Sequence, residues 1–242
     1  MTTEAPLRRA TTGTLDYYLL HAAAEDVQPI GLLVEEFVLA DDLSATRLRS
    51  AGWTAAPVAA TGHLGVEPLD GGWWSSAAFA RAVRTDRQLR ARLAATDRAT
   101  AEATYHRLGG GALPGDEALR DHFHDDVPLA SGAPLRLGTG TDVHRVLFAG
   151  ELDDRRLERL SRQLRLAAPV DPPATRPGVI GTGRLRVNDT NARWDLQRVG
   201  GAWCIDVTST PPGRDALRWL LRQLTDLARG QGLVPATIDR LG

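Results

Sequence analysis

Residues 183–229 constrain the fold more than any other part of the chain. Apolar and polar residues alternate along three short segments, and the gaps between them, at 188–191 and 199–201, are rich in residues that favour turns. Leucines at helical spacing follow, and Gly230 ends the run. The pattern predicts a three-stranded antiparallel meander and an amphipathic helix that covers its apolar face.

The residues before this region mainly predict helices. Ser76, Asp86 and Asp153 are good helix N-caps, and apolar residues follow each of them at helical spacing. A short helix is also expected after Asp42, which is another good N-cap. The apolar run at 30–39 suits a buried helix and a strand equally well by its periodicity, so its type stays open.

We therefore expect an α+β protein in which a helix-rich N-terminal region precedes a mainly antiparallel sheet. This sheet includes the C-terminal three-stranded meander and is covered by amphipathic helices. Residues 1–130 would form the helix-rich region, which carries a tryptophan-bearing loop. Residues 131–242 would form an α+β region that ends in the meander and its helix. The sequence leaves open whether the two regions form one continuous domain.

The composition is that of an ordinary globular protein. The chain has 242 residues, of which 43% are hydrophobic and 24% charged. Cys204 is the only cysteine, so no intramolecular disulfide can form. No apolar run reaches the length of a membrane span, and no secretory leader pattern is found. We therefore expect a cytoplasmic protein with no disulfide and no transmembrane segment.

The charges are distributed unevenly along the chain. All 29 basic residues are arginine, a bias typical of a high-GC genome such as an actinobacterial one. Residues 1–150 hold 14 arginines against 19 acidic residues, a net charge of −5, whereas residues 151–242 hold 15 against 11, a net charge of +4. This asymmetry favours self-association or an acidic partner for the C-terminal half. Neither value approaches that of a nucleic-acid-binding domain.

Three tryptophans fall in a stretch rich in Gly, Pro and Ala that is expected to be an ordered loop. Trp53, Trp73 and Trp74, together with Arg81, are the candidate substrate-binding residues. Indole rings offer large rigid surfaces to an apolar or planar ligand, and an arginine can bind a carboxylate or a phosphate. The other three tryptophans are expected in the core: Trp194, Trp203 and Trp219.

Two pairs of ionisable residues are candidates for chemistry. Asp142 and His144 follow a glycine-rich turn and would point to the same side of an extended segment, so both are candidate catalytic residues. Asp195 and Asp206 are expected on neighbouring strands, where two carboxylates permit acid–base chemistry or form a solvated face with nearby arginines. The sequence assigns no residue to a metal site and identifies no cofactor.

The sequence permits three functions, in this order. The first is a small tailoring or transfer enzyme that acts on a peptide or a small molecule, which requires a cavity at the loop tryptophans. The second is a non-catalytic accessory or immunity-type protein-binding factor, which requires an exposed apolar patch on the tryptophan loop or the arginine-bearing final helix. Nucleic-acid binding ranks last, because Asp215 and Asp226 interrupt the arginines of the final helix. No membrane partner is expected.

Overall fold

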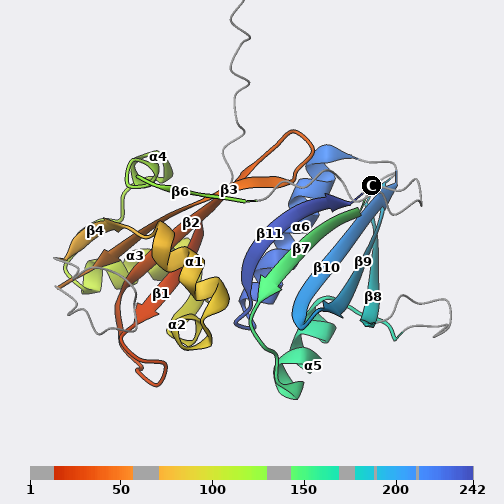
Figure 1. Ribbon diagram of the computed structural model, residues 1–242, viewed down its shortest axis with the longest axis horizontal. Helices are drawn as coiled ribbons and strands as arrows, with labels where there is room; N and C mark the ends of the chain where they lie inside the picture. Colours follow the sequence, from red (N-terminus) through yellow and green to blue (C-terminus); the bar gives the residue numbers. More distant parts are fainter. Residues whose placement is uncertain are drawn as a thin grey trace, which may run out of the picture.

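Two antiparallel sheets form the body of the protein (Figure 1). The computed structural model describes residues 14–56, 71–129, 143–168, 178–187, 190–210 and 213–241. The first sheet is six-stranded, with the order β4-β3-β2-β1-β5 and with β6 paired to β3. Its strands are β1 (Asp16–His21), β2 (Pro29–Leu39), β3 (Ala45–Thr54), β4 (Gly72–Ser75), β5 (Leu93–Thr96) and β6 (Asp126–Pro128).

The second sheet is five-stranded and has the order β11-β7-β10-β9-β8. Its strands are β7 (Val143–Ala149), β8 (Val179–Val187), β9 (Thr190–Val199), β10 (Ala202–Thr210) and β11 (Val234–Leu241). The helices are α1 (Ala77–Thr85), α2 (Arg87–Ala91), α3 (Arg98–Arg107), α4 (Asp116–Arg120), α5 (Asp154–Gln163) and α6 (Arg214–Arg229). Within the described ranges, no helix is long and apolar enough to cross a membrane.

The first sheet occupies the region that the sequence predicts to be rich in helices. Its central strand β2 is buried on both faces: Leu32 and Val34 pack in one hydrophobic cluster, and Leu33 packs in another on the opposite side. A strand that is covered on both faces shows no alternation of apolar and polar residues. Its periodicity therefore could not distinguish it from a buried helix.

One helix expected in this region is absent, and another is shorter than expected. After Asp42 the chain makes a turn, in which the carboxylate accepts hydrogen bonds from the N–H and the hydroxyl of Ser44 at 3.0 and 2.6 Å. The long helix expected after Asp86 is divided into α2 and α3 by β5, which pairs with β1. The predicted helix-rich N-terminal region is therefore wrong, because pairing between distant strands outweighs the local helical pattern.

The second sheet contains the predicted meander and two further strands. β8, β9 and β10 pair in sequence order, β7 pairs with the other side of β10, and β11 pairs with β7. The prediction that amphipathic helices cover this sheet is also wrong. Ile205 of β10 belongs to a hydrophobic cluster that joins leucines of α5 and α6 to residues of the first sheet, including Phe37 and Leu48. The two sheets therefore share one core.

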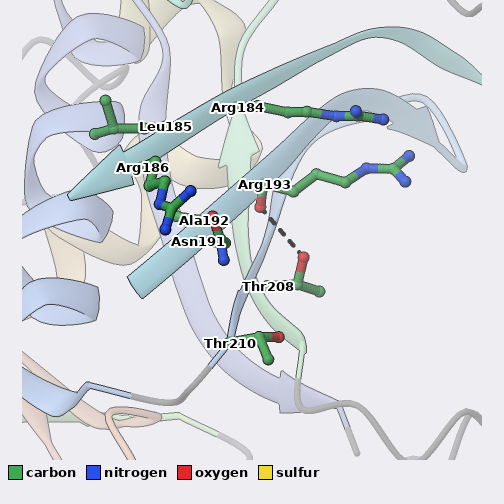
Figure 2. Close-up of a pocket in the computed structure, with 8 residues that line it drawn as sticks. All are labelled: Arg184, Leu185, Arg186, Asn191, Ala192, Arg193, Thr208 and Thr210. Carbon is green, nitrogen blue, oxygen red and sulfur yellow. Dashed lines mark hydrogen bonds between the residues drawn. The ribbon is translucent and has the colours of Figure 1, made fainter. Parts of the chain in front are cut away.

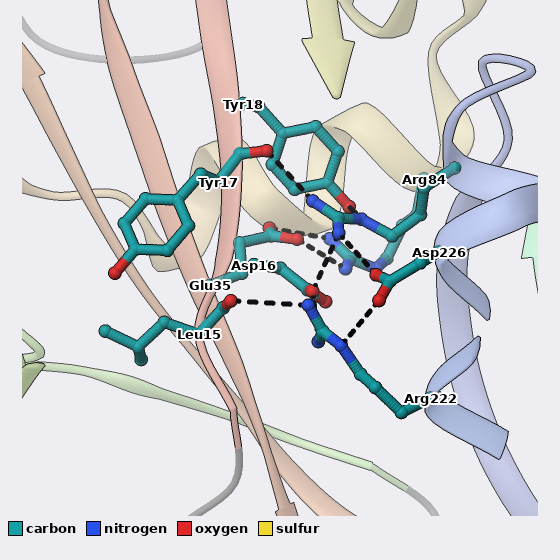
Figure 3. Close-up of polar contacts among 9 residues, drawn as sticks. Leu15, Asp16, Tyr17, Tyr18, Glu35, Arg84, Arg222 and Asp226 are labelled. Carbon is teal, nitrogen blue, oxygen red and sulfur yellow. Dashed lines mark hydrogen bonds and ion pairs between the residues drawn. The ribbon is translucent and has the colours of Figure 1, made fainter. Parts of the chain in front are cut away.

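Buried charges join the first sheet to the second (Figure 3). Asp16 of β1 forms ion pairs with Arg222 and Arg229 of α6, at 2.5 and 2.9 Å. Arg84 of α1 donates to both carboxylate oxygens of Glu35, at 3.1 and 3.0 Å, and its Nε donates to the carbonyl oxygen of Pro235 in β11 at 2.9 Å. These contacts place β11 toward the first sheet and leave β8 as the far edge of the second (Figure 1).

Candidate functional site

The three candidate binding tryptophans lie on the first sheet. Trp53 is buried in β3, with 6% of its surface exposed. Trp73 and Trp74 are neighbours on β4, so their side chains point to opposite faces of the sheet. Trp73 stacks on His122 with 4.7 Å between ring centroids, whereas Trp74 packs edge-on against Phe79 at 5.8 Å. Trp73 and Trp74 therefore do not line one pocket together.

The other predicted site residues are not gathered around these rings. His144 is buried in β7, and its Nε2 lies 2.8 Å from the backbone carbonyl oxygen of Asp42. Arg81 is exposed on α1, and Asp142 lies outside the described residues. In the part of the chain that the structure describes, no three of His, Cys, Asp or Glu come together in a way that could hold a metal ion.

Asp195 and Asp206 lie directly opposite each other on β9 and β10, as the sequence predicts. Asp206 accepts hydrogen bonds from Nε and Nη2 of Arg145 at 2.7 and 2.8 Å, and a third bond from Gln197. Asp195 forms an ion pair with Arg193 at 3.1 Å. Because each carboxylate is engaged by an arginine, this row of side chains stabilises the sheet and offers no free acid–base pair.

The second sheet ends at β8, whose outer edge is only partly covered. The N–H of Ala167 donates to the carbonyl oxygen of Thr182 at 2.9 Å, and the N–H of Thr182 donates to that of Ala167 at 3.0 Å. On the side of Ala167 toward α5, the chain turns away at Arg165, which has a positive φ of 51°. The segment that leads from α5 to Ala167 thus adds a single bridge to this edge.

The next backbone groups along the edge have no partner in the described ranges. Groups of alternate residues on a strand point to the same side, so the N–H and C=O of Arg184 and Arg186 point outward, like those of Thr182. Gly183 and Leu185, in between, pair with β9. The edge of β8 therefore presents the N–H and C=O groups of both arginines to a further strand.

The outer face of this edge is basic (Figure 2). Arg184 lies opposite Arg193 of β9, and Arg193 lies opposite Thr208 of β10. Arg186 and Asn191 form the next row. These side chains line a pocket of about 310 Å³. Arg193 is engaged by a carboxylate of its own strand, whereas the guanidinium groups of Arg184 and Arg186 are exposed and bind no carboxylate of the described residues.

The inner face of the same edge is apolar. A groove of about 270 Å³ lies between β8, β9 and the first half of α6, and its walls include Leu185, Ala192, Leu217 and Leu220. Trp219 of α6 also lines the groove and is 53% exposed, although the sequence predicts it in the core. The helical periodicity carried a signal that the prediction missed, because Trp219 lies roughly opposite the leucine stripe of this helix.

Three features therefore meet at β8: backbone groups that have no partner among the described residues, a basic outer face and an apolar groove. An extended segment that pairs with this edge would place successive side chains on alternate faces. One set would reach the arginines and the other the groove, which is the geometry of strand addition. The sequence identifies β8 as a strand but gives no sign of its edge position, because that depends on how β7 and β11 pair.

Comparisons of this chain with known protein families, with curated proteins and with solved structures find no match. The candidate site therefore rests on its own geometry and charge.

Proposed function

We propose that this protein is a non-catalytic protein-binding factor that takes up an extended segment of a partner at the edge of β8. The observation that carries the proposal is the pair of outward backbone groups at Arg184 and Arg186, which lie between an apolar groove and a basic face. Backbone hydrogen bonds would supply affinity, and the two faces would supply specificity.

The two faces define the sequence of the segment. Side chains that lie opposite Arg184 and Arg186 point to the basic face and are acidic in the preferred partner. The side chain between them lies opposite Leu185, points into the groove beside Trp219 and is apolar. The motif is therefore acidic–apolar–acidic, and it reads the same in both strand directions. The net charge of +4 in residues 151–242 favours the same kind of partner.

A second copy of this chain fits the edge less well than an acidic partner. If two copies of β8 paired with each other, arginines of one copy would face arginines of the other on the same face. Like charges that lie directly opposite each other destabilise a sheet. The arginines therefore act against self-pairing and select a partner of the opposite charge.

The test is a binding titration with a short fluorescent peptide of alternating glutamate and leucine, followed by fluorescence anisotropy. We expect saturable binding that becomes weaker as salt is added. A peptide with lysine in place of glutamate should bind at least tenfold more weakly. Trp219→Ala should also weaken binding, because the groove loses its exposed wall. The charge control is Arg155→Ala, which removes an exposed arginine from α5.

The contribution of the backbone is isolated by comparing Arg184→Pro with Arg184→Ala. Both variants remove the charge, but only proline removes the outward N–H, and proline is tolerated at sheet edges. We expect the proline variant to bind about five- to tenfold more weakly than the alanine variant, since one backbone hydrogen bond is lost. Equal binding by the two variants, or equal binding of the glutamate and lysine peptides, would overturn the proposal.

A further inference from the structure

A further cavity lies where the two sheets meet, and no residue of β8 lines it. It has a volume of about 690 Å³ and lies between α2 and β5 on one side and α5 and the end of α6 on the other. In Figure 1, α2 and α5 both lie along the lower side of the molecule, one beside each sheet. Cavities of this size between two parts of a protein commonly bind small molecules.

Five arginines line this cavity, and three of them have carboxylate partners. Arg87 reaches Glu151 at 3.4 Å, and Arg156 lies 3.6 Å from Asp153. Arg229 is buried and binds both Asp16 and Asp226, at 2.9 and 3.0 Å. Each of these three arginines therefore already has a carboxylate beside it.

The remaining two arginines form no ion pair with a carboxylate of the described residues, although Glu151 also lines the cavity and acts on Arg90 from a distance. Arg90 donates from Nη1 to the carbonyl oxygen of Val83 at 2.8 Å, and neither it nor Arg159 forms an ion pair with a described carboxylate. Arg90 is partly buried, and this burial lowers the pKa of its guanidinium group. A partly desolvated cation that no carboxylate contacts directly is stabilised when an anion binds beside it.

We propose that this cavity binds a small organic phosphate, held by Arg90 from α2 and Arg159 from α5. Two planar guanidinium groups from different elements suit an anion with several oxygens and more than one charge, as a phosphate has. The wall formed by Ala91, Leu93 and Ala95 is apolar and suits a compact organic group attached to that phosphate. This site is independent of the β8 edge and of the function proposed for it.

The probe for this site is inorganic pyrophosphate, titrated into the full chain by isothermal calorimetry at constant ionic strength. We expect saturable binding at one site, and sulfate at the same ionic strength should not compete effectively. Arg159→Gln should weaken binding about tenfold, since it removes a charge-assisted hydrogen bond to the phosphate. Arg90→Gln should have a similar effect. A thermal melt of each variant checks that it is folded.

The matched control is Arg155→Gln, which makes the same charge change on α5 at an exposed residue that does not line the cavity. We expect its affinity for pyrophosphate to stay within twofold of the unmodified protein. If Arg155→Gln weakens binding as much as Arg159→Gln does, the attraction is non-specific and the proposal is wrong. The absence of any binding at millimolar pyrophosphate would also overturn the proposal. If Arg90→Gln fails to fold, the comparison of Arg159→Gln with Arg155→Gln still tests it.

Discussion

Among the described residues, four carboxylates are almost fully buried, and each forms an ion pair with an arginine. Asp16, Glu35, Glu36 and Asp206 are each at most 4% exposed. Their partners are Arg222 and Arg229, Arg84, Arg120 and Arg145, respectively. Arginine suits this role because its planar fork binds both oxygens of a carboxylate and stays charged when buried. The abundance of arginine therefore has a structural use here.

At the scale of single residues, the buried ion pair between Glu35 and Arg84 should contribute to the stability of the fold. Glu35→Gln leaves the guanidinium group, whose side chain is 10% exposed, without a counter-ion. We expect the free energy of unfolding to fall by about 3–5 kcal/mol, as for other broken buried ion pairs, when measured by urea denaturation. The control is Glu158→Gln, which removes an exposed pair with Arg162 and should change stability by less than about 1 kcal/mol. Equal losses in both variants would contradict the prediction.

The buried thiol of Cys204 should make the stability of the folded protein depend on pH in the alkaline range. Burial raises the pKa of its thiol to about 11, and burial also raises the pKa of Tyr18. Because the folded state favours the neutral forms, these groups destabilise the fold as the pH rises above the unfolded thiol pKa, near 9. We expect thermal melts to show stability falling between about pH 9 and 11. Cys204→Ala should reduce this loss by about 1–3 kcal/mol, and identical pH profiles would refute the assignment.

At the scale of the element, a close contact between the backbones of β2 and β3 tests how these two strands pair. An added Cβ at Gly31 of β2 would lie 2.0 Å from the backbone carbonyl oxygen of Trp53, and backbone cannot move aside as a side chain can. We expect Gly31→Ala to destabilise the first sheet by at least about 3 kcal/mol. Gly115→Ala is the control, because nothing lies within 4 Å of its added Cβ. A chemical denaturation curve for each variant measures the difference, and a stable Gly31→Ala variant would count against this register.

Sequence patterns predict the exposed or half-buried elements of this protein better than the buried ones. The meander is predicted because one face of β9 is polar, and α5 and α6 because each has a single apolar stripe. The strand β2 is not predicted, because both of its faces are buried. Its two charged residues, Glu35 and Glu36, bind arginines that lie 49 and 84 residues away in the sequence. Contacts between residues so far apart leave no local pattern.

The candidate site shows the same limit. The alternation of arginines with Leu185 and Val187 places Arg184 and Arg186 on the polar face of the predicted meander. Whether their backbone groups have partners depends on which strands flank the meander. β11, which follows α6, pairs with β7, and β8 remains at the edge. The position of Trp219 around the axis of α6, away from the leucine stripe, is enough to predict that it lies outside the core. The sequence therefore held this information, and the prediction did not use it.

At the scale of the whole molecule, the shared core and the buried charges predict cooperative unfolding. Asp16 of the first sheet binds two arginines of α6, and one hydrophobic cluster includes residues of both sheets. We expect a single calorimetric transition whose van't Hoff and calorimetric enthalpies agree. Asp16→Asn should lower the transition temperature by roughly 10 °C, from a loss of about 3 kcal/mol. Two separate transitions in the unmodified protein would show that the sheets unfold independently.

Because its single cysteine, Cys204, is buried, the protein is convenient for site-specific labelling. This cysteine is fully buried, and its raised pKa leaves almost no thiolate near neutral pH. A cysteine introduced on the surface, at Arg186 or at Arg159, would therefore react with a maleimide dye while the native thiol stays unmodified. One fluorophore could then be attached to each proposed binding surface in turn, in a chain that keeps its own cysteine.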